Sequence, residues 1–322
     1  MTYQINLGLC CINNSLRSDG RDWLLSSGLI QKRPRAKVEI FCSRSTPRSH
    51  YTLESAKTKA LDNTRDLLYL LQWNHQHNIK HLRISSDMFP RFTDPKVESY
   101  TIDFAIDNLK IASEYAKQHQ HRLTFHPGQF NQIGAKNPDV FESTCKDLKH
   151  HADIFDVMDI DQSGILCIHG GGMYGDKESA MRLWIEQFDD LHTSVKRRIA
   201  IENCEKCYTV RDCLHMADAC KIPVILDTHH YLCYNILHPD IQQESLDDML
   251  PEVVDSWSRY NCRPLFHISD QAENKPIGSH HDYIKEIPNS LLQLSIEHEI
   301  DIEVEAKAKE VAILQLKKQY NI

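Results

Sequence analysis

The chain has 322 residues, of which 41% are hydrophobic and 25% are charged, and its formal net charge is -8 at pH 7. No run of the sequence approaches the roughly 18 apolar residues that span a membrane, so we expect a globular protein without a membrane anchor. The acidic balance argues against nucleic-acid binding through net charge alone, but local charge can override it. The first residues lack the basic and apolar regions of a secretion signal, so we expect an intracellular protein, cytoplasmic in a prokaryote and nuclear in a eukaryote.

Short apolar runs alternate with stretches of helical periodicity along the chain, which predicts eight β/α units. The predicted strands cover residues 5–10, 81–85, 123–126, 165–169, 199–202, 224–227, 265–267 and 302–305. The predicted helices cover about 53–76, 102–117, 138–157, 178–191, 210–219, 246–260, 283–293 and 309–318. Without a linker between the units, they predict a single TIM (β/α)8 barrel domain over residues 1–322. An open doubly wound sheet is the alternative, but no GxGxxG turn follows the first strand.

Six of the apolar runs end in a residue that can bind a metal. These residues are His126, His169, Glu202, Asp227, His267 and Glu305. One such residue at a strand end is usually a hydrogen-bonded polar group. Six of them on the C-terminal face of one barrel would repel one another or remain desolvated without cations between them. The sequence therefore predicts a multi-metal centre, and ligands of this kind suit manganese, zinc, iron or magnesium without selecting one.

Two other features of the sequence leave alternatives open. Basic residues gather between the first strand and the first long helix: Lys32, Arg33, Arg35, Lys37, Arg44 and Arg48. This segment is either a substrate-facing loop of the barrel or a solvated, mobile loop. Among the 11 cysteines, Cys204 and Cys207 form a CxxC motif without a second pair. The motif is weak support for zinc or redox chemistry, and we prefer the interpretation that most cysteines are reduced packing residues.

Eight short motifs in the sequence resemble those of the UV damage endonuclease family. In chain order they are RISSDMFP at 83–90, HPGQF at 126–130, HGGG at 169–172, EN at 202–203, DTHH at 227–230, HIS at 267–269, HHDY at 280–283 and EAK at 305–307. They span nearly the whole chain in the family's order, which makes the series highly specific. The resemblance implies a barrel of the xylose isomerase and endonuclease IV type.

The resemblance also implies two or three divalent metal ions per chain, with manganese as the expected metal. The implied ligands are His126, His169, Glu202, Asp227, His230, His267, His280 and Glu305. Glu202 would bridge two of the ions, while His230 and His280 would hold a third. Two metal ions roughly 3.5 to 4 Å apart can clamp the attacking and the leaving oxygen of a phosphoryl transfer.

The activity that the resemblance implies is that of a DNA repair endonuclease. Its reaction would be hydrolysis of the phosphodiester immediately 5′ to a pyrimidine dimer in double-stranded DNA. The expected catalytic residues are Glu202 and Lys177, where Lys177 contacts a phosphate unless it is an ordinary surface lysine. We expect the enzyme to act as a monomer. The alternative function is a metal-dependent sugar isomerase or epimerase on the same barrel.

Lesion recognition is implied at three further positions. Gln129 and Phe130 match a pair that probes the duplex, although Phe130 could instead be a loop-packing residue. Asn13 matches an asparagine near the family's lesion pocket. Two departures concern the metal centre: Asp94 stands where many members have histidine, and Leu265 replaces a lysine common two residues before the seventh-strand histidine. Asp94 is therefore an uncertain ligand.

Overall fold

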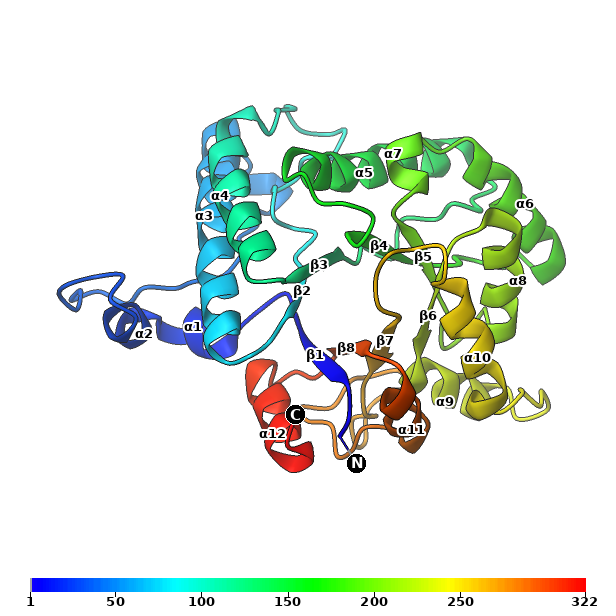
Figure 1. Cartoon of the computed structure of the whole chain (residues 1–322). Helices are drawn as coiled ribbons and strands as arrows, with labels where there is room; N and C mark the ends of the chain where they lie inside the picture. Colours follow the sequence, from blue (N-terminus) through cyan, green and yellow to red (C-terminus); the bar gives the residue numbers. More distant parts are fainter. Residues whose placement is uncertain (1) are drawn as a thin grey trace.

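Eight parallel strands close into a barrel that is surrounded by helices (Figure 1), and this computed structural model describes residues 2–322. The strands are β1 (Ile5–Cys10), β2 (His81–Ile84), β3 (Arg122–Phe125), β4 (Ile165–His169), β5 (Ile199–Glu202), β6 (Val224–Asp227), β7 (Leu265–Ile268) and β8 (Ile300–Val304). Each strand pairs with the next, and β8 closes on β1 from Ile5 opposite Ile300 to Leu9 opposite Val304. The predicted TIM barrel is confirmed, and the open doubly wound sheet is wrong.

The helices lie outside the strands and in the loops between them. They are α1 (Asn14–Asp19), α2 (Arg21–Ser26), η1 (Arg48–His50), α3 (Leu53–Gln76), η2 (Asp103–Ala105), α4 (Ile106–Gln118), α5 (Pro138–Val157), α6 (Lys177–Asp189), α7 (Thr193–Lys196), α8 (Val210–Cys220), α9 (Thr228–Leu237), α10 (Leu246–Ser256), α11 (Asn289–Glu297) and α12 (Glu310–Tyr320). Within residues 2–322, no helix combines the length and the apolarity needed to cross a bilayer.

Two helices differ from the sequence prediction in an informative way. The helix predicted at 283–293 is α11 and begins only at Asn289, after Pro288, whose fixed φ favours a position at the start of a helix. Helix α9 was not predicted at all. It begins directly after β6, where the Asp227 side chain accepts a hydrogen bond from the His230 amide and caps the helix. A potential metal ligand therefore also serves as a helix cap.

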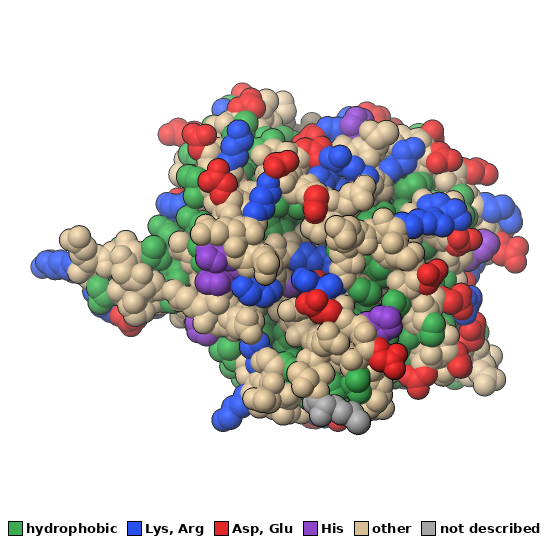
Figure 2. Space-filling view, viewed as in Figure 1, with side chains coloured by type: hydrophobic (Ala, Val, Ile, Leu, Met, Phe, Trp, Pro, Cys, Tyr) green, Lys and Arg blue, Asp and Glu red, His purple; other side chains and the backbone are tan. Residues whose placement is uncertain are grey.

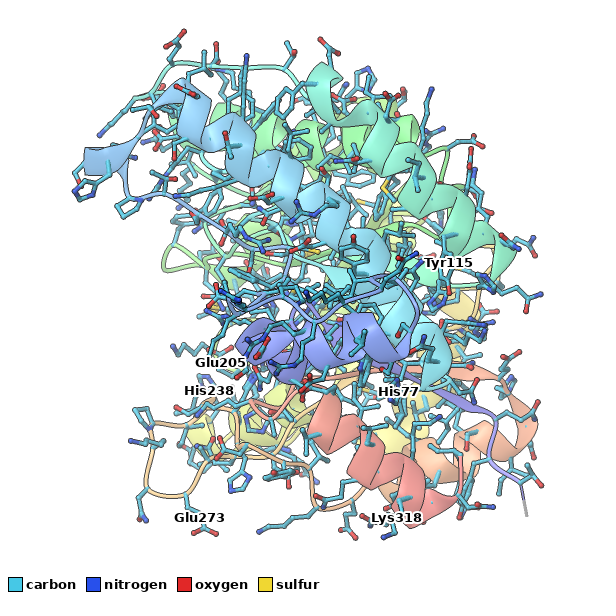
Figure 3. All side chains as sticks on the ribbon, turned by 90° about the vertical axis from the view of Figure 1, so that its left-hand side faces the viewer. His77, Tyr115, Glu205, His238, Glu273 and Lys318 are labelled. Carbon is cyan, nitrogen blue, oxygen red and sulfur yellow. The ribbon has the colours of Figure 1, made fainter. Side chains whose placement is uncertain are left out.

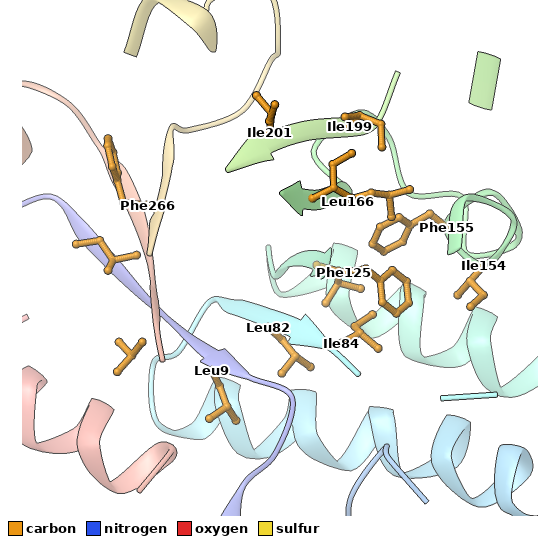
Figure 4. Packing of buried hydrophobic residues seen from close by; sticks show 14 of the residues in the cluster. Leu9, Leu82, Ile84, Phe125, Ile154, Phe155, Leu166, Ile199, Ile201 and Phe266 are labelled. Atoms are coloured by element: carbon orange, nitrogen blue, oxygen red, sulfur yellow. The ribbon is translucent and has the colours of Figure 1, made fainter. Parts of the chain in front are cut away.

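The apolar core lies between the outer face of the barrel and the helices. Leu82 and Ile84 of β2 point away from the barrel axis (Figure 4), and both side chains are buried. Phe125 of β3 packs with Phe155 of α5 at 4.8 Å between ring centroids. Because side chains alternate along a strand, the residues between these apolar positions point into the barrel.

The inside of the barrel is unusually polar, and strand β8 shows this most clearly. Asp301, Glu303 and Glu305 follow one another at a spacing of two, so their carboxylates share the inner face. Asp301 Oδ2 lies 2.8 Å from Arg122 Nη1, and its Oδ1 lies 2.7 Å from Arg263 Nε. The prediction that residues 302–304 form an apolar run is therefore wrong at Glu303. Charged groups of opposite sign therefore fill much of the barrel axis.

The Asp301 carboxylate should be essential for stability. The Asp301→Ala variant leaves the buried guanidinium of Arg122 without its partner, so we expect a loss of about 3–5 kcal/mol in the free energy of unfolding. Urea unfolding followed by circular dichroism measures this loss. The control is Glu142→Ala, which removes an exposed ion pair with Lys146 on α5 and should change stability by less than about 0.5 kcal/mol. Equal losses in the two variants would contradict the assignment.

A group of histidines lies at the opposite end of the barrel from the C-terminal strand ends. His121 directly precedes β3, is buried, and neither ring nitrogen has a hydrogen-bond partner within the described chain. The ring centroids of His75 and His119 are 4.1 Å apart, and that of His75 is 6.1 Å from His121. Burial, with the nearby charge of Lys80, lowers the pKa of His121 to about 3.

This depressed pKa predicts a loss of stability in mild acid. In the unfolded chain, the His121 imidazole binds a proton below about pH 6.5, whereas in the folded chain it stays neutral down to about pH 3. The free energy of unfolding therefore falls as the pH falls from about 6.5 to about 3. Between about pH 7 and about pH 5, the wild type should lose about 2 kcal/mol more than the His121→Gln variant. Unfolding titrations at both pH values measure the difference. The exposed His215→Gln variant should follow the wild type; if His121→Gln does so too, the pKa shift is refuted.

Candidate metal centre

The six strand-end residues predicted as ligands lie at the C-terminal mouth of the barrel. His169, Glu202 and Asp227 are the last residues of β4, β5 and β6; His126 and Glu305 directly follow β3 and β8; His267 is the third residue of β7. The barrel thus places them around one opening, because parallel strands all end on the same face.

Glu202 lies at the centre of this group, and its side chain is fully buried. Its Oε2 atom lies 2.9 Å from His126 Nε2 and 3.7 Å from His169 Nε2. Its Oε1 atom lies 2.9 Å from His267 Nδ1 and 3.5 Å from His230 Nδ1. Imidazoles from three strand ends and from α9 therefore surround a single carboxylate.

Two further carboxylates border the same space. Asp227 Oδ1 accepts the His230 amide at 2.7 Å, which leaves Oδ2 for another partner. Glu305 Oε1 lies 3.4 Å from His267 Nδ1, and Glu305 Oε2 lies 3.5 Å from His280 Nδ1. The structure therefore brings together all eight residues that the sequence analysis assigned as metal ligands.

The charges of these groups depend strongly on one another. Burial raises the pKa of Glu202, but His267 and His169 outweigh it, so the pKa lies well below its usual range. Burial lowers the pKa of His169 to about 4. Burial raises the pKa of Asp227, partly offset by His230. Burial lowers the pKa of His267, but Glu202 and Glu303 outweigh it and raise the pKa overall. The centre therefore combines an ionised carboxylate with one neutral imidazole and one that holds its proton, and a metal ion would have to replace that proton.

The donor atoms fit a divalent metal. In three groups of the described residues, the potential ligand atoms lie within 4.8 Å of one another: His126, Cys167, Glu202 and His267; His169, Glu202 and His230; and Cys10, Glu303 and Glu305. His169 Nδ1 and Asp227 Oδ2 are buried and have no hydrogen-bond partner among residues 2–322. Buried polar atoms of this kind are usually satisfied, so these two have capacity for an additional partner. Nitrogen and oxygen donors suit first-row transition metals.

Sequence reasoning missed three residues in or next to the centre, which are Cys167, Arg83 and Glu303. Cys167 Sγ lies 3.1 Å from Glu202 Oε2, although it was interpreted as a packing cysteine. Arg83 of β2 binds Glu305 and lies 3.2 Å from Glu303 Oε2. Each missed residue stands two positions before another polar residue at the end of its own strand, and this period of two could have identified them.

Two candidates lie apart from the centre. Lys177 Nζ lies 2.7 Å from Asp212 Oδ2 and 3.3 Å from the Tyr234 hydroxyl, so its charge is already paired. Asp94 Oδ2 lies 2.8 Å from Arg48 Nη2, and Asp94 Oδ1 accepts the Lys96 amide. Burial raises the pKa of Asp94, but these donors outweigh it and lower the pKa overall. Asp94 is part of the cavity wall described below.

The proposed lesion contacts differ sharply in exposure. Asn13 is fully buried, and its Oδ1 accepts the Leu16 amide at 2.9 Å as the N-cap of α1, so it does not face solvent. Leu265, which stands where a lysine is common, is also fully buried and lies inside the barrel beneath His267. Phe130, by contrast, is 62% exposed.

A cavity of about 720 Å³ opens beside the centre. Its wall includes His126 of the centre, the exposed Phe130, the aromatic residues Phe89 and Phe92, and Asp94. The ring of Phe130 lies over Gly128, where an added Cβ would be only 2.7 Å from it. Gln129 is exposed next to Phe130. The pair therefore stands at the rim of a space large enough for small ligand groups.

Only some of the basic side chains between β1 and α3 are exposed without an ion-pair partner among the described residues. Arg33 pairs with Asp22, Arg44 lies 2.7 Å from the buried Asp66, and Arg48 is held by Asp94. Lys32, Arg35 and Lys37 are exposed. The segment protrudes from the barrel beside α1 and α2 (Figure 1), and Lys and Arg side chains form the tip of this arm (Figure 2). Elsewhere on the face in Figure 2, basic and acidic side chains are mixed.

Comparison with known proteins gives one consistent sequence family. The family model described as UV-endonuclease UvdE matches residues 5–322. A UV-damage endonuclease from Schizosaccharomyces pombe is 31% identical over 98% of this chain and 51% of its own length. A UV DNA damage endonuclease from Bacillus mycoides is 30% identical over 87% of this chain and 88% of its own length. The chain thus spans about half of the first relative and most of the second.

Solved structures agree with this grouping. The crystal structure of SacUVDE has a TM-score of 0.80 and 27% identity, and the match covers 98% of this chain and 99% of that chain. Endonuclease IV from Thermus thermophilus has a TM-score of 0.54 at 11% identity, over 80% of this chain and 93% of that chain, and shares the fold. With a family model that matches nearly every residue, the chain belongs to the UV-endonuclease UvdE family.

Proposed function

We propose that the chain is a metal-dependent DNA repair endonuclease that hydrolyses the phosphodiester immediately 5′ to UV photoproducts in double-stranded DNA. The main supporting observation is the buried Glu202 carboxylate, which imidazoles from β3, β4, β7 and α9 approach at the mouth of the barrel. Membership of the UV-endonuclease family supports the substrate class. We propose that the protein acts as an intracellular monomer.

The proposed metal ligands are the eight residues around Glu202, with Cys167 as an additional donor close to them. Two or three bound divalent ions, manganese in this proposal, would neutralise phosphate charge and lower the pKa of a water molecule. Glu202 is the central ligand because it is the one carboxylate shared by both groups of nearby donor atoms that contain histidine. Asp227 and Glu305 would add negative charge on either side of it.

The protein itself would orient the reacting groups and exclude bulk water from them. Glu202 orients the imidazoles of His126 and His267, each 2.9 Å from one of its oxygens, and Arg83 fixes Glu305 from the other side. We propose that Lys177 is a positioning residue that acts through Tyr208, because its ammonium lies 6.0 Å from the centroid of the Tyr208 ring. The Tyr208 hydroxyl in turn donates to the carbonyl of Gly172, in the glycine loop after β4. Preorganised groups of this kind stabilise a phosphoryl-transfer transition state without reorganising.

Lesion recognition would come from the rim of the cavity. An exposed aromatic ring beside the metal centre can enter a base step that damage has weakened, and an extruded base needs a pocket to receive it. Phe130, Gln129 and the adjacent cavity meet these needs. The exposed basic residues of the arm could contact phosphates at a distance from the incision, which offsets the acidic net charge locally.

The sugar isomerase alternative is not favoured. A small polyol does not require a protruding basic arm, an exposed aromatic residue at the rim or so many ligands. The family model that matches residues 5–322 describes an endonuclease.

The Glu202→Gln variant tests the metal centre. The amide keeps the shape of the side chain but loses the charge shared by the donor groups, so nicking of a dimer-containing duplex in manganese should fall by more than about 100-fold. Binding to the same duplex, measured by fluorescence anisotropy, should remain largely unchanged because the fully buried Glu202 side chain offers no surface to DNA. Glu142→Gln, on the exposed face of α5, is the control. Retained cleavage by Glu202→Gln would refute the assignment.

The Phe130→Ala variant tests the proposed wedge. Loss of a stacking ring that contributes about 1–3 kcal/mol should reduce the preference for damaged over intact duplex by about 10-fold. The preference is measured as the ratio of the two dissociation constants. Ile111→Ala removes another exposed apolar side chain, on α4, and should leave the ratio unchanged. An unaltered ratio in Phe130→Ala would show that the ring is only a packing residue.

A further inference from the structure

The CxxC motif lies on the loop between β5 and α8, immediately after Glu202. The Cys204 amide donates to the Tyr208 carbonyl at 3.0 Å, which closes a tight turn. Within this turn, the amides of Cys207 and Tyr208 both donate to Cys204 Sγ, at 3.2 and 3.3 Å. The backbone therefore holds the sulfur of Cys204 against Cys207.

The two thiols differ in access. The Cys204 residue is only 8% exposed, whereas Cys207 is half-buried. All 11 cysteines are free, and they all lie in the described part of the chain. A sheltered cysteine whose sulfur is bonded to the backbone of a more exposed cysteine has the arrangement that thiol–disulfide exchange requires. The packing interpretation does not explain why one of the two is left open.

We propose that Cys204 and Cys207 form a reversible disulfide by exchange with low-molecular-mass disulfides such as oxidised glutathione. Cys207 sulfur attacks one glutathione sulfur, so a mixed disulfide forms, the glutathione S–S bond breaks, and one reduced glutathione leaves with the Cys207 proton. Cys204 sulfur then attacks Cys207 sulfur, and the second glutathione leaves with the Cys204 proton. The protein loses two electrons and two protons, and glutathione disulfide gains them.

This pair is mechanically connected to the metal centre. Asn203 lies between Glu202 and Cys204, and its side chain bonds to the backbone of Asp227 at 2.8 and 3.0 Å. On its outer side, the loop meets the end of α9, because His238 Nε2 lies 3.0 Å from the Lys206 carbonyl. Glu205 of the loop and His238 are labelled at the same edge of the molecule in Figure 3. Closure of the disulfide would therefore act on a loop that is fixed at both ends. The proposal is independent of the DNA-cleaving activity.

Trypsin provides a direct test, because it cuts after Lys206, between the two cysteines. The reduced full-length protein is incubated with oxidised glutathione, the free thiols are alkylated, and the non-reducing digest is analysed by mass spectrometry. We expect peptides 199–206 and 207–211 to be joined, with a loss of about 2 Da relative to their sum, and to separate after reduction. Absence of the joined peptides would overturn the proposal.

Three variants define the order of attack. Cys204→Ser should stop after the first step and retain one glutathione on Cys207. Cys207→Ser should acquire none in this loop, because Cys204 is sheltered. Cys220→Ser removes a half-buried thiol of α8 and should still give the joined peptides. A glutathione adduct on Cys204 in Cys207→Ser, or none on Cys207 in Cys204→Ser, would overturn the assigned roles.

Discussion

The buried contact between Glu202 and its imidazoles is the constraint on which the rest of the mouth depends. A fully buried carboxylate is costly unless positive or hydrogen-bonding groups surround it. Here His126 and His267 both approach within 2.9 Å, from opposite parts of the strand ring. Because these residues come from β3 and β7, the contact forms only when the barrel is closed. The site therefore cannot form unless the whole barrel has folded.

The same balance of charge continues down the barrel axis. Glu303 Oε1 accepts the Thr124 hydroxyl at 2.6 Å and lies 2.8 Å from His81 Nε2, and Asp301 below it pairs with Arg122. An interior built in this way depends on mutual pairing, since removing one partner leaves a buried charge. The apolar stabilisation comes instead from the outer face of the strands, where residues such as Phe125 meet the helices. The outer face of the strands thus supplies most of the apolar stabilisation, while the inner face carries the ionisable groups.

Strand ends were predictable because each apolar run stops at a polar residue. Glu303 and Arg83 escaped prediction because each lies inside a run interpreted as a buried strand, and the period of two that links Glu303 to Glu305 and Arg83 to Ser85 was not applied there. Helix α9 escaped because its start coincides with Asp227, a residue interpreted only as a ligand. Asn13 matched a family position, but its burial as a helix cap depends on the packing of the α1 turn, which no local motif reports.

By itself, the sequence determined the alternation of strands and helices, the barrel, the family and the set of polar residues at the strand ends. These are local properties: periodicity, turn residues and motif order. The tertiary structure alone decided that Cys167 borders Glu202, that Lys177 is paired with Asp212, and that the Cys207 amide donates to the Cys204 sulfur within a closed turn. The first two of these contacts form only when the barrel folds. They join residues that are far apart in the sequence, and no local pattern in the sequence indicates that such residues will meet.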